Sequence, residues 1–190
     1  MGKTFDRIGP KHAAFIAGQQ IFFTASAGES GRVNVSPRGT GAFRVVDPGI
    51  VTYLDETGSG NETAAHLRLT GRLTIMFCSF GAEPMILRLY GQGRSLPLGS
   101  AEYHAMLKRA YGNEQPPGTR QIIRLDVEMV LVSCGNGVPV FDFVAPRPAL
   151  RQRAAEKGEA WLATYRRENN AVSIDGFPTG FGADELDMVG

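Results

Sequence analysis

Apolar residues along the chain fall into short runs that are separated by turn-forming residues. Some runs alternate apolar and polar side chains, as Val33 and Val35 do, and others are almost entirely apolar. Both patterns are typical of β-strands when glycine, proline or aspartate bounds each run. The turn Asp47-Pro48-Gly49, for example, separates two such runs and predicts a hairpin. The predicted strands are residues 21–25, 32–36, 43–46, 50–54, 72–80, 85–91 and 121–133.

Four segments carry helical patterns instead. They are residues 10–19, 62–69, 100–110 and 150–167. Gly158 lies inside the last of these, where glycine costs about 1 kcal/mol relative to alanine, so an unbroken helix is not assured there. The strands follow one another in meander order rather than alternating with helices. This order predicts a mainly β fold, an antiparallel barrel with peripheral helices, and not a Rossmann sheet.

Composition narrows the function classes. The chain has 190 residues, including 24 Gly and 11 Pro, and no linker divides it, so we expect one domain over residues 1–190. The formal net charge of +1, without a basic stripe, argues against a nucleic-acid partner. No apolar run approaches the length of a membrane span, and residues 1–10 have no apolar signal core, so the expected location is the cytoplasm.

Cysteine and histidine offer little chemistry. Cys78 and Cys134 lie far apart in apolar runs, and we expect two buried free thiols. His12, His66 and His104 lie on three different predicted helices and have no partner at metal-ligand spacing. The sequence therefore predicts no metal site.

The most informative segment joins a predicted strand to the predicted helix at 62–69. It reads Gly58-Ser59-Gly60-Asn61-Glu62-Thr63, with Asn61 as the expected helix cap. Free N–H groups at a helix N-terminus favour an anion, and Ser59, Asn61 and Thr63 add side-chain donors. The same spacing also fits a plain strand-to-helix turn, and Glu62 would compete with a phosphate unless it points away.

Two arginines could neutralise such an anion. Arg38 follows Pro37 at the predicted end of a strand, and Arg72 begins the strand after the helix. A guanidinium can bind a phosphate through two parallel hydrogen bonds. Taken alone, Arg38 could equally be a solvated surface residue.

The order of these segments resembles the pyridoxamine 5'-phosphate oxidase-like, FMN-binding split-barrel proteins. The likeness lies in Arg32-Val33-Asn34-Val35-Ser36-Pro37-Arg38-Gly39, in Ile50 to Asp55, and in Gly58 to Thr63. The strands at 72–77 and 86–91 fit the family's next two. The likeness spans residues 10–135, the expected barrel core, and leaves a C-terminal helix and tail at residues 148–190.

The resemblance implies a six-stranded, Greek-key-like antiparallel split barrel that forms a homodimer, with FMN in clefts at the dimer interface. Phosphate would be held by Ser59, Asn61 and Thr63, and its charge countered by Arg38 or Arg72. The strand edge from Ser36 to Gly39 would offer backbone groups to the flavin. The implied cofactor-binding set is Ser36, Arg38, Gly39, Leu54, Ser59, Asn61, Thr63 and Arg72.

The implied function is a flavin-dependent oxidoreductase with a small-molecule substrate or electron donor, in which the flavin carries the redox chemistry. The segment after Asn169 is acidic through Asp175, Asp184, Glu185 and Asp187. Family members that oxidise pyridoxamine phosphate have a basic stretch there, so a second phosphate-bearing substrate is not expected. No catalytic acid or base is assigned. The alternatives are a non-catalytic flavin- or haem-binding protein and a deazaflavin-dependent reductase.

Overall fold

The computed structural model describes residues 2–181, and in this part of the chain eight strands form one antiparallel sheet. The strands are β1 (Lys3–Phe5), β2 (Ile21–Ser26), β3 (Asn34–Gly39), β4 (Phe43–Asp47), β5 (Ile50–Glu56), β6 (Arg72–Cys78), β7 (Ile86–Pro97) and β8 (Thr119–Ser133). The helices are α1 (Pro10–Ala17), α2 (Glu62–Leu69), α3 (Ala101–Tyr111) and α4 (Ala149–Asn169), with a short 3-10 turn η1 (Thr40–Ala42).

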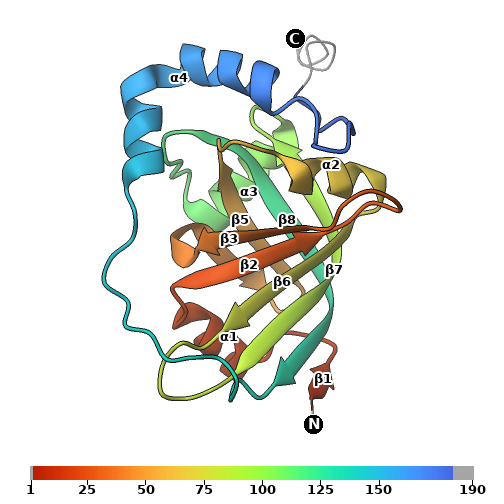
Figure 1. Cartoon of the computed structure of the whole chain (residues 1–190), viewed down its shortest axis with the longest axis vertical. Coiled ribbons are helices and arrows are strands. Elements are labelled where there is room, and N and C mark those ends of the chain that lie inside the picture. Colours follow the sequence, from red (N-terminus) through yellow and green to blue (C-terminus); the bar gives the residue numbers. More distant parts are fainter. Residues whose placement is uncertain (1, 182–190) are drawn as a thin grey trace.

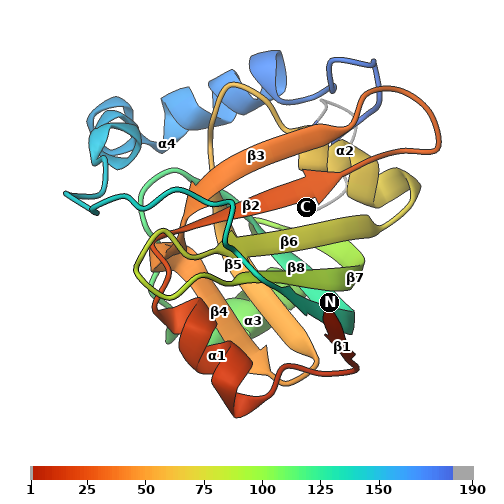
Figure 2. The same ribbon diagram turned by 60° about the horizontal axis from the view of Figure 1, so that its bottom comes forward.

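The sheet curls into a half-barrel. Its strand order is β3-β2-β6-β7-β8-β5-β4, and the short β1 pairs with β8 outside this path. The two edge strands, β3 and β4, are consecutive in the chain and are joined through η1. The curl brings the β2–β3 hairpin across from β5, as the two ribbon views show (Figures 1 and 2).

Aromatic side chains fill the concave side of the sheet. The Phe22 ring on β2 lies 5.1 Å from Phe43 on β4 and 5.3 Å from Tyr53 on β5, centroid to centroid, in edge-to-face geometry. Phe77 on β6 completes the group, at 5.0 Å from Phe43. Such pairs add to the stabilisation that apolar burial provides. These contacts hold the two ends of the curled sheet together around one core.

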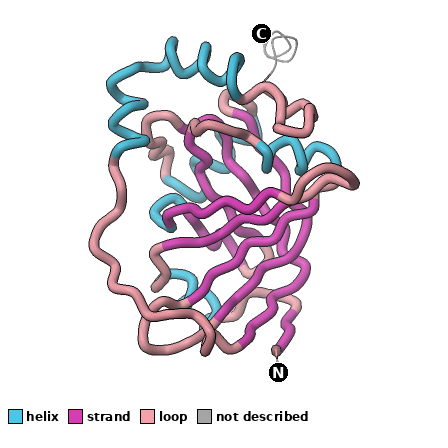
Figure 3. Tube along the Cα trace, in the orientation of Figure 1, coloured by secondary structure: helices cyan, strands magenta, loops and turns pink. Residues whose placement is uncertain are grey.

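The helices cover the ends and margins of the sheet (Figures 1 and 3). Ser100 caps α3 by accepting a hydrogen bond from the backbone N–H of Tyr103. The segment between β8 and α4 runs along one side of the molecule from the lower to the upper end of the sheet in Figure 1. There α4 and the residues that follow it lie close to α2. None of the helices within residues 2–181 is long and apolar enough to cross a membrane.

The mainly β antiparallel fold and its peripheral helices are confirmed, although the described sheet has eight strands rather than six. The strand predicted at residues 32–36 ends too early, because β3 runs from Asn34 through Pro37 to Gly39. An edge strand tolerates a proline, since one side of the strand has no ladder partner. Cys78 is buried as expected, but Cys134 is exposed because it lies just beyond the end of β8.

The long C-terminal helix bends at Gly158. This residue has φ 76° and ψ 168°, which lie outside the helical region, so α4 consists of two helical pieces joined by a kink. A positive φ of this size strains any residue with a Cβ atom. The glycine that argued against an unbroken helix is therefore the residue at which the helix turns.

Candidate functional site

Polar side chains meet where β3 faces the end of β5 and the start of α2. We call this group the seam: Asn34, Ser36, Arg38, Asp55, Asn61 and Thr63. The curl of the sheet creates it, because the chain returns from β5 into α2 opposite the free edge strand β3. Four of the eight predicted cofactor residues, Ser36, Arg38, Asn61 and Thr63, lie in this group.

Asp55 is the centre of the buried charge in the seam. Its Oδ2 atom accepts hydrogen bonds from Arg120 Nε at 2.8 Å and from Gln121 Nε2 at 2.6 Å, both at the start of β8. Its Oδ1 atom accepts a hydrogen bond from Arg38. The side chains of Asp55 and Arg120 are 1% and 3% exposed. One buried carboxylate thus forms ion pairs with two guanidinium groups.

The charges in this cluster shift each other's protonation. Burial by itself would raise the pKa of Asp55, but Arg120, Arg38 and the hydrogen bond from Gln121 lower it to about 2. Burial would lower the pKa of Arg38, but the charge and hydrogen bond of Asp55, together with Tyr53 and Glu56, raise it above its usual value. The lowered pKa keeps Asp55 ionised near neutral pH, and this one carboxylate faces two guanidinium groups.

Arg38 is held on two sides yet keeps a free donor. Its guanidinium carbon lies 4.9 Å from the centre of the Tyr53 ring, within the range of a cation–π contact. Its Nε atom is buried and has no hydrogen-bond partner among the described residues. Because buried donors are almost always satisfied, this atom is available to an added acceptor.

Asn61 occupies the N-cap position of α2 as predicted, but its side chain does not cap the helix. The Oδ1 atom instead accepts a hydrogen bond from Gln121 Nε2 at 2.8 Å. The Nδ2 atom is buried without a partner in the described part of the chain. The predicted loop therefore presents a buried, unused donor beside a helix N-terminus.

The β3 side of the seam is linked to α2 through Asn34. Its Nδ2 atom donates to Thr63 Oγ1 at 3.2 Å, and its Oδ1 atom accepts from Ser36 Oγ at 3.3 Å. Ser36 and Thr63 thus share one hydrogen-bonded chain across the seam. This chain fixes the distance between the edge strand and the helix.

Residues 170–181 close the seam on one side. Asn170 accepts from Arg120 Nη1 at 2.8 Å and donates to the carbonyl oxygen of Gly58 at 3.0 Å. The backbone N–H of Ile174 donates to the Glu62 carboxylate at 3.1 Å, so Glu62 points toward this segment. The segment therefore holds the carboxylate that could have competed with a bound anion.

One of the acidic residues predicted for the tail, Asp175, is paired with a basic residue of the described chain. Asp175 forms an ion pair with Arg32 and accepts its backbone N–H at 2.7 Å. That backbone hydrogen bond is the main cause of the lowered pKa of Asp175. The other acidic positions, Asp184, Glu185 and Asp187, lie outside the described residues.

A cavity of about 170 Å³ adjoins the seam. Arg38, Gly39 and Leu54 line it, together with Phe22, Pro37, Ala42, Tyr53, Glu56, Leu150 and Arg151. Gly39 and Leu54, two further predicted cofactor residues, therefore belong to the same neighbourhood as the seam. Arg151, on α4, pairs with Glu56 at 2.7 Å and closes this side.

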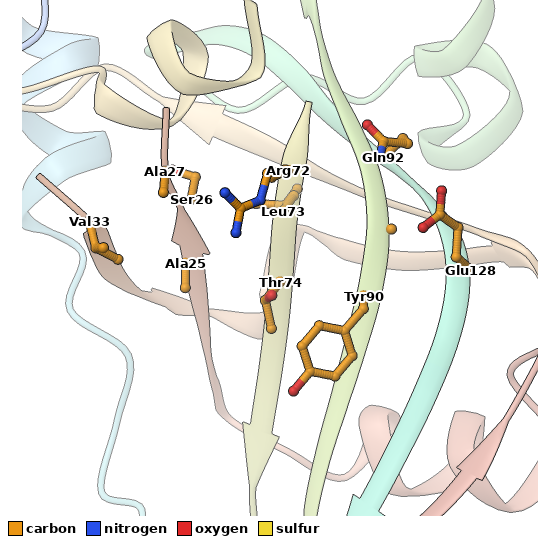
Figure 4. Close-up of a pocket in the computed structure, with 11 residues that line it drawn as sticks. Ala25, Ser26, Ala27, Val33, Arg72, Leu73, Thr74, Tyr90, Gln92 and Glu128 are labelled. Carbon is orange, nitrogen blue, oxygen red and sulfur yellow. The ribbon is translucent and has the colours of Figure 1, made fainter. Parts of the chain in front are cut away.

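The remaining two predicted residues lie elsewhere. Ser59 lines a small cavity against α4, next to Trp161 and Tyr165, whose rings stack at 5.0 Å. Arg72 lies in a cavity of about 400 Å³ on the convex face of the sheet. Figure 4 shows it there with Tyr90, and with Glu128 across β7. The structure thus separates Arg38 from Arg72 and puts only Arg38 at the seam.

Sequence patterns did not identify the residues that hold the seam together from β5, from β8 and from the segment after α4. Arg120, Gln121 and Asn170 were not assigned a role, and neither was Asp55. A carboxylate at the end of the apolar run at residues 50–54 was a usable signal, because a buried charge needs partners. No local pattern pointed to Asn170, which lies 50 residues from Arg120 in the chain.

Comparisons with known proteins agree with this architecture. Residues 8–134 match the family model described as pyridoxamine 5'-phosphate oxidase. The pyridoxamine 5'-phosphate oxidase family protein ustO of Aspergillus flavus is 39% identical over 178 residues, which cover 84% of this chain and 70% of that protein. The region that the family model matches contains every residue of the seam.

Solved structures with low sequence identity share the fold. A single-residue variant of HupZ from Group A Streptococcus is 20% identical, with a TM-score of 0.54 over 66% of this chain and 99% of that one. A Lactobacillus delbrueckii protein assigned to the pyridoxamine 5'-phosphate oxidases is 13% identical, with a TM-score of 0.53 over 66% and 94%. The extent of the family match and the identity to the Aspergillus protein show that the chain belongs to the pyridoxamine 5'-phosphate oxidase family.

Proposed function

We propose that this protein binds FMN at the seam and acts as a flavin-dependent oxidoreductase on a small molecule. The observation that carries the proposal is the surplus positive charge of Arg38 and Arg120 over Asp55, next to the N-terminus of α2. A buried cation in excess is costly unless an anion joins it. The phosphate of FMN is such an anion, and family membership supports this choice.

The donors of the seam fit a phosphate or the polar edge of a flavin. Arg38 Nε and Asn61 Nδ2 are buried without partners in the described chain, and each can donate one more hydrogen bond. The Glu62 carboxylate, in the first turn of α2, accepts the backbone N–H of Ile174. Helix N-termini bind anions through their free N–H groups.

The remaining residues of the seam would position the cofactor. Asp55 keeps Arg38 in place, and Arg120 connects Asp55 to the carbonyl oxygen of Gly60 in the loop before α2. Gly39 and Leu54 would provide backbone and apolar contacts in the adjoining cavity. The bound flavin would supply the electron transfer, while this chain binds it, orients it and shields it from water.

We infer that the working unit is a homodimer. An exposed apolar strip supports this inference, formed by Val35 on β3 and Val33 just before it, with Val172 and Ile174 beside them. The ion pair between Arg32 and Asp175 brings these two parts of the strip together. Exposed apolar patches of this kind mark interaction sites. Sedimentation of the protein at several concentrations tests the inference, and a monomer at all of them would refute it.

The deciding experiment is the visible spectrum of the purified protein, followed by titration of the apoprotein with FMN. We expect a flavin spectrum, stoichiometric quenching of FMN fluorescence, and bleaching when a nicotinamide donor is added. A haem spectrum would replace the proposal with the haem-binding alternative. A colourless protein that quenches no FMN would refute flavin binding altogether. Bound flavin that no nicotinamide donor reduces would leave a flavin-binding protein and refute the oxidoreductase.

A further inference from the structure

The segment between β8 and α4 encloses a second, larger cavity. It measures about 590 Å³ and is lined by Gly18, Gln19, Gln20, Ile21, Gly39, Phe80, Gly81, Phe141, Asp142, Phe143 and Arg147. The rings of Phe80 and Phe141 lie 5.5 Å apart, and the N–H of Phe141 donates to the Phe80 carbonyl oxygen at 2.9 Å. This volume lies within the range of small-molecule sites.

Aromatic side chains that are open to solvent dominate this wall. Phe141 and Phe143 are 62% and 57% exposed, although each lines the cavity. Removing apolar surface from water is favourable. An apolar ligand that covers these rings would therefore gain binding free energy. The wall is therefore suited to a flat, apolar molecule.

The charges of the wall balance one another. Asp142 and Arg147 carry one charge of each sign, and no hydrogen bond or ion pair joins either side chain to another described residue. A ligand with a large net charge would meet attraction from one of them and repulsion from the other. An ionic ligand would therefore gain no net attraction here to offset its lost hydration, and the lining favours a ligand without net charge.

Gly39 connects this cavity to the proposed flavin site. It lines both the 590 Å³ cavity and the smaller cavity that contains Arg38 and Leu54. A Cβ atom built on Gly39 would meet no other atom within 4 Å, so open space lies on this side of its backbone. A molecule in the larger cavity would lie next to a flavin held at the seam.

We propose that this cavity is the substrate site. The substrate is an apolar molecule without net charge, about the size of an aromatic ring system. The inference rests on the proposed flavin site for its chemistry, but binding in the cavity does not depend on flavin. Phe141 and Phe143 supply the contact area, and Gly39 is the point at which substrate and flavin meet.

The test uses N-phenylnaphthylamine, an uncharged aromatic probe that fluoresces in apolar surroundings, on the full chain without flavin. We expect saturable binding at one site, with affinity reduced about tenfold or more by Phe141→Ser or Phe143→Ser. Both residues are largely exposed, so these variants will fold. Val144→Ser is the matched control, because Val144 is 92% exposed on the same segment and does not line the cavity.

The charged wall residues make a second prediction. Anilinonaphthalene sulfonate should bind more weakly than the uncharged probe, and Arg147→Gln should weaken binding of the sulfonate further. Stronger binding of the sulfonate, lost in Arg147→Gln, would overturn the uncharged class in favour of an anion. Equal affinity in all variants would overturn the site.

Two further outcomes separate this inference from the flavin site and from other occupants. With FMN bound, the probe should perturb the flavin spectrum, and the Phe141→Ser variant should still bind FMN normally. If flavin binding fails while the probe behaves as expected, the cavity stands and the proposed function falls. If probe binding falls as protein concentration rises, a second copy of the chain covers the segment and the substrate proposal is wrong.

Discussion

Arg120 and Asp55 form an ion pair with an Nε–Oδ2 distance of 2.8 Å, in which both side chains are almost completely buried. The pair joins the start of β8 to the end of β5, two strands that lie side by side in the sheet. The other two ends of the Arg120 guanidinium hold Asn170 and the carbonyl oxygen of Gly60. One side chain therefore connects the sheet, the loop before α2 and the C-terminal segment.

Replacing Asp55 by asparagine should destabilise the protein strongly. The substitution removes the only carboxylate that Arg120 and Arg38 contact in the described chain. It leaves the buried Arg120 and the partly buried Arg38 without their counter-charge, and the loss at Arg120 alone costs about 3–5 kcal/mol in the free energy of unfolding. Urea denaturation of the apoprotein measures this cost.

Asp47→Asn is the matched control for that experiment. Asp47 pairs with Arg109 at 2.9 Å, but both side chains are substantially exposed. Exposed pairs contribute about 0–1 kcal/mol, so the control should unfold close to the wild-type urea concentration. A loss of equal size in both variants would contradict the special role of burial at Asp55.

Stability should also fall in acid. The pKa of Asp55 is lowered from 3.8 to about 2, so the folded state favours the ionised carboxylate more than the unfolded state does. The corresponding stabilisation, about 2 kcal/mol, is complete above pH ~4 and is lost as the pH falls toward ~2. Urea midpoints at several pH values should show this loss in the wild type. In Asp55→Asn, the decrease over the same interval should be smaller by about that amount.

The two candidate arginines make different predictions for FMN. Arg38→Ala removes a donor at the seam and should weaken FMN binding by about 1–3 kcal/mol, whereas Arg72→Ala on the convex face should leave the affinity unchanged. Asp55 retains its bond to Arg120 in the first variant, so the fold survives. Fluorescence titration compares the two. The opposite ranking would place the phosphate on the convex face.

Asn170 should determine whether the C-terminal segment stays in place. Its amide bonds Arg120 on one side and the carbonyl oxygen of Gly58 on the other, and Asn170→Ala removes both hydrogen bonds. We expect faster chymotrypsin cleavage near Phe177 and weaker FMN binding, because the loop before α2 loses its support. Asn169→Ala is the control, since among residues 2–181 the side chain of Asn169 bonds only to the Tyr165 carbonyl oxygen of its own helix. Unchanged cleavage in Asn170→Ala would show that the segment is held by other contacts.

Sequence patterns predicted the elements better than the contacts between them. The helix predicted at residues 62–69 matches α2, because a glycine-rich loop begins it and Gly71 follows it. The strand at 85–91 was too short, since β7 continues to Pro97 through residues whose burial comes from pairing with β8. The local pattern of apolar residues carries no information about which strands pair.

The candidate site follows the same rule: local features were predicted, and contacts between distant segments were not. Arg38, Asn61 and Thr63 were identified from a local loop and a strand end, and the structure brings them to one seam. Ser59 and Arg72 were grouped with them from the loop pattern, the start of the next strand and the family resemblance, yet Ser59 lies against α4 and Arg72 on the convex face. The long-range partners Arg120 and Asn170 follow from tertiary structure alone.

Pro37 has a consequence for how the open sheet avoids polymerising into fibrils. It lies in β3, an edge strand of the sheet, opposite Phe23 of β2. Proline in an edge strand has no N–H to offer to an incoming strand. Strand-by-strand addition, the route by which open sheets polymerise into fibrils, therefore meets an interrupted ladder at this edge. The half-barrel can leave this edge open, as the proposed cofactor site requires, without becoming a template for aggregation.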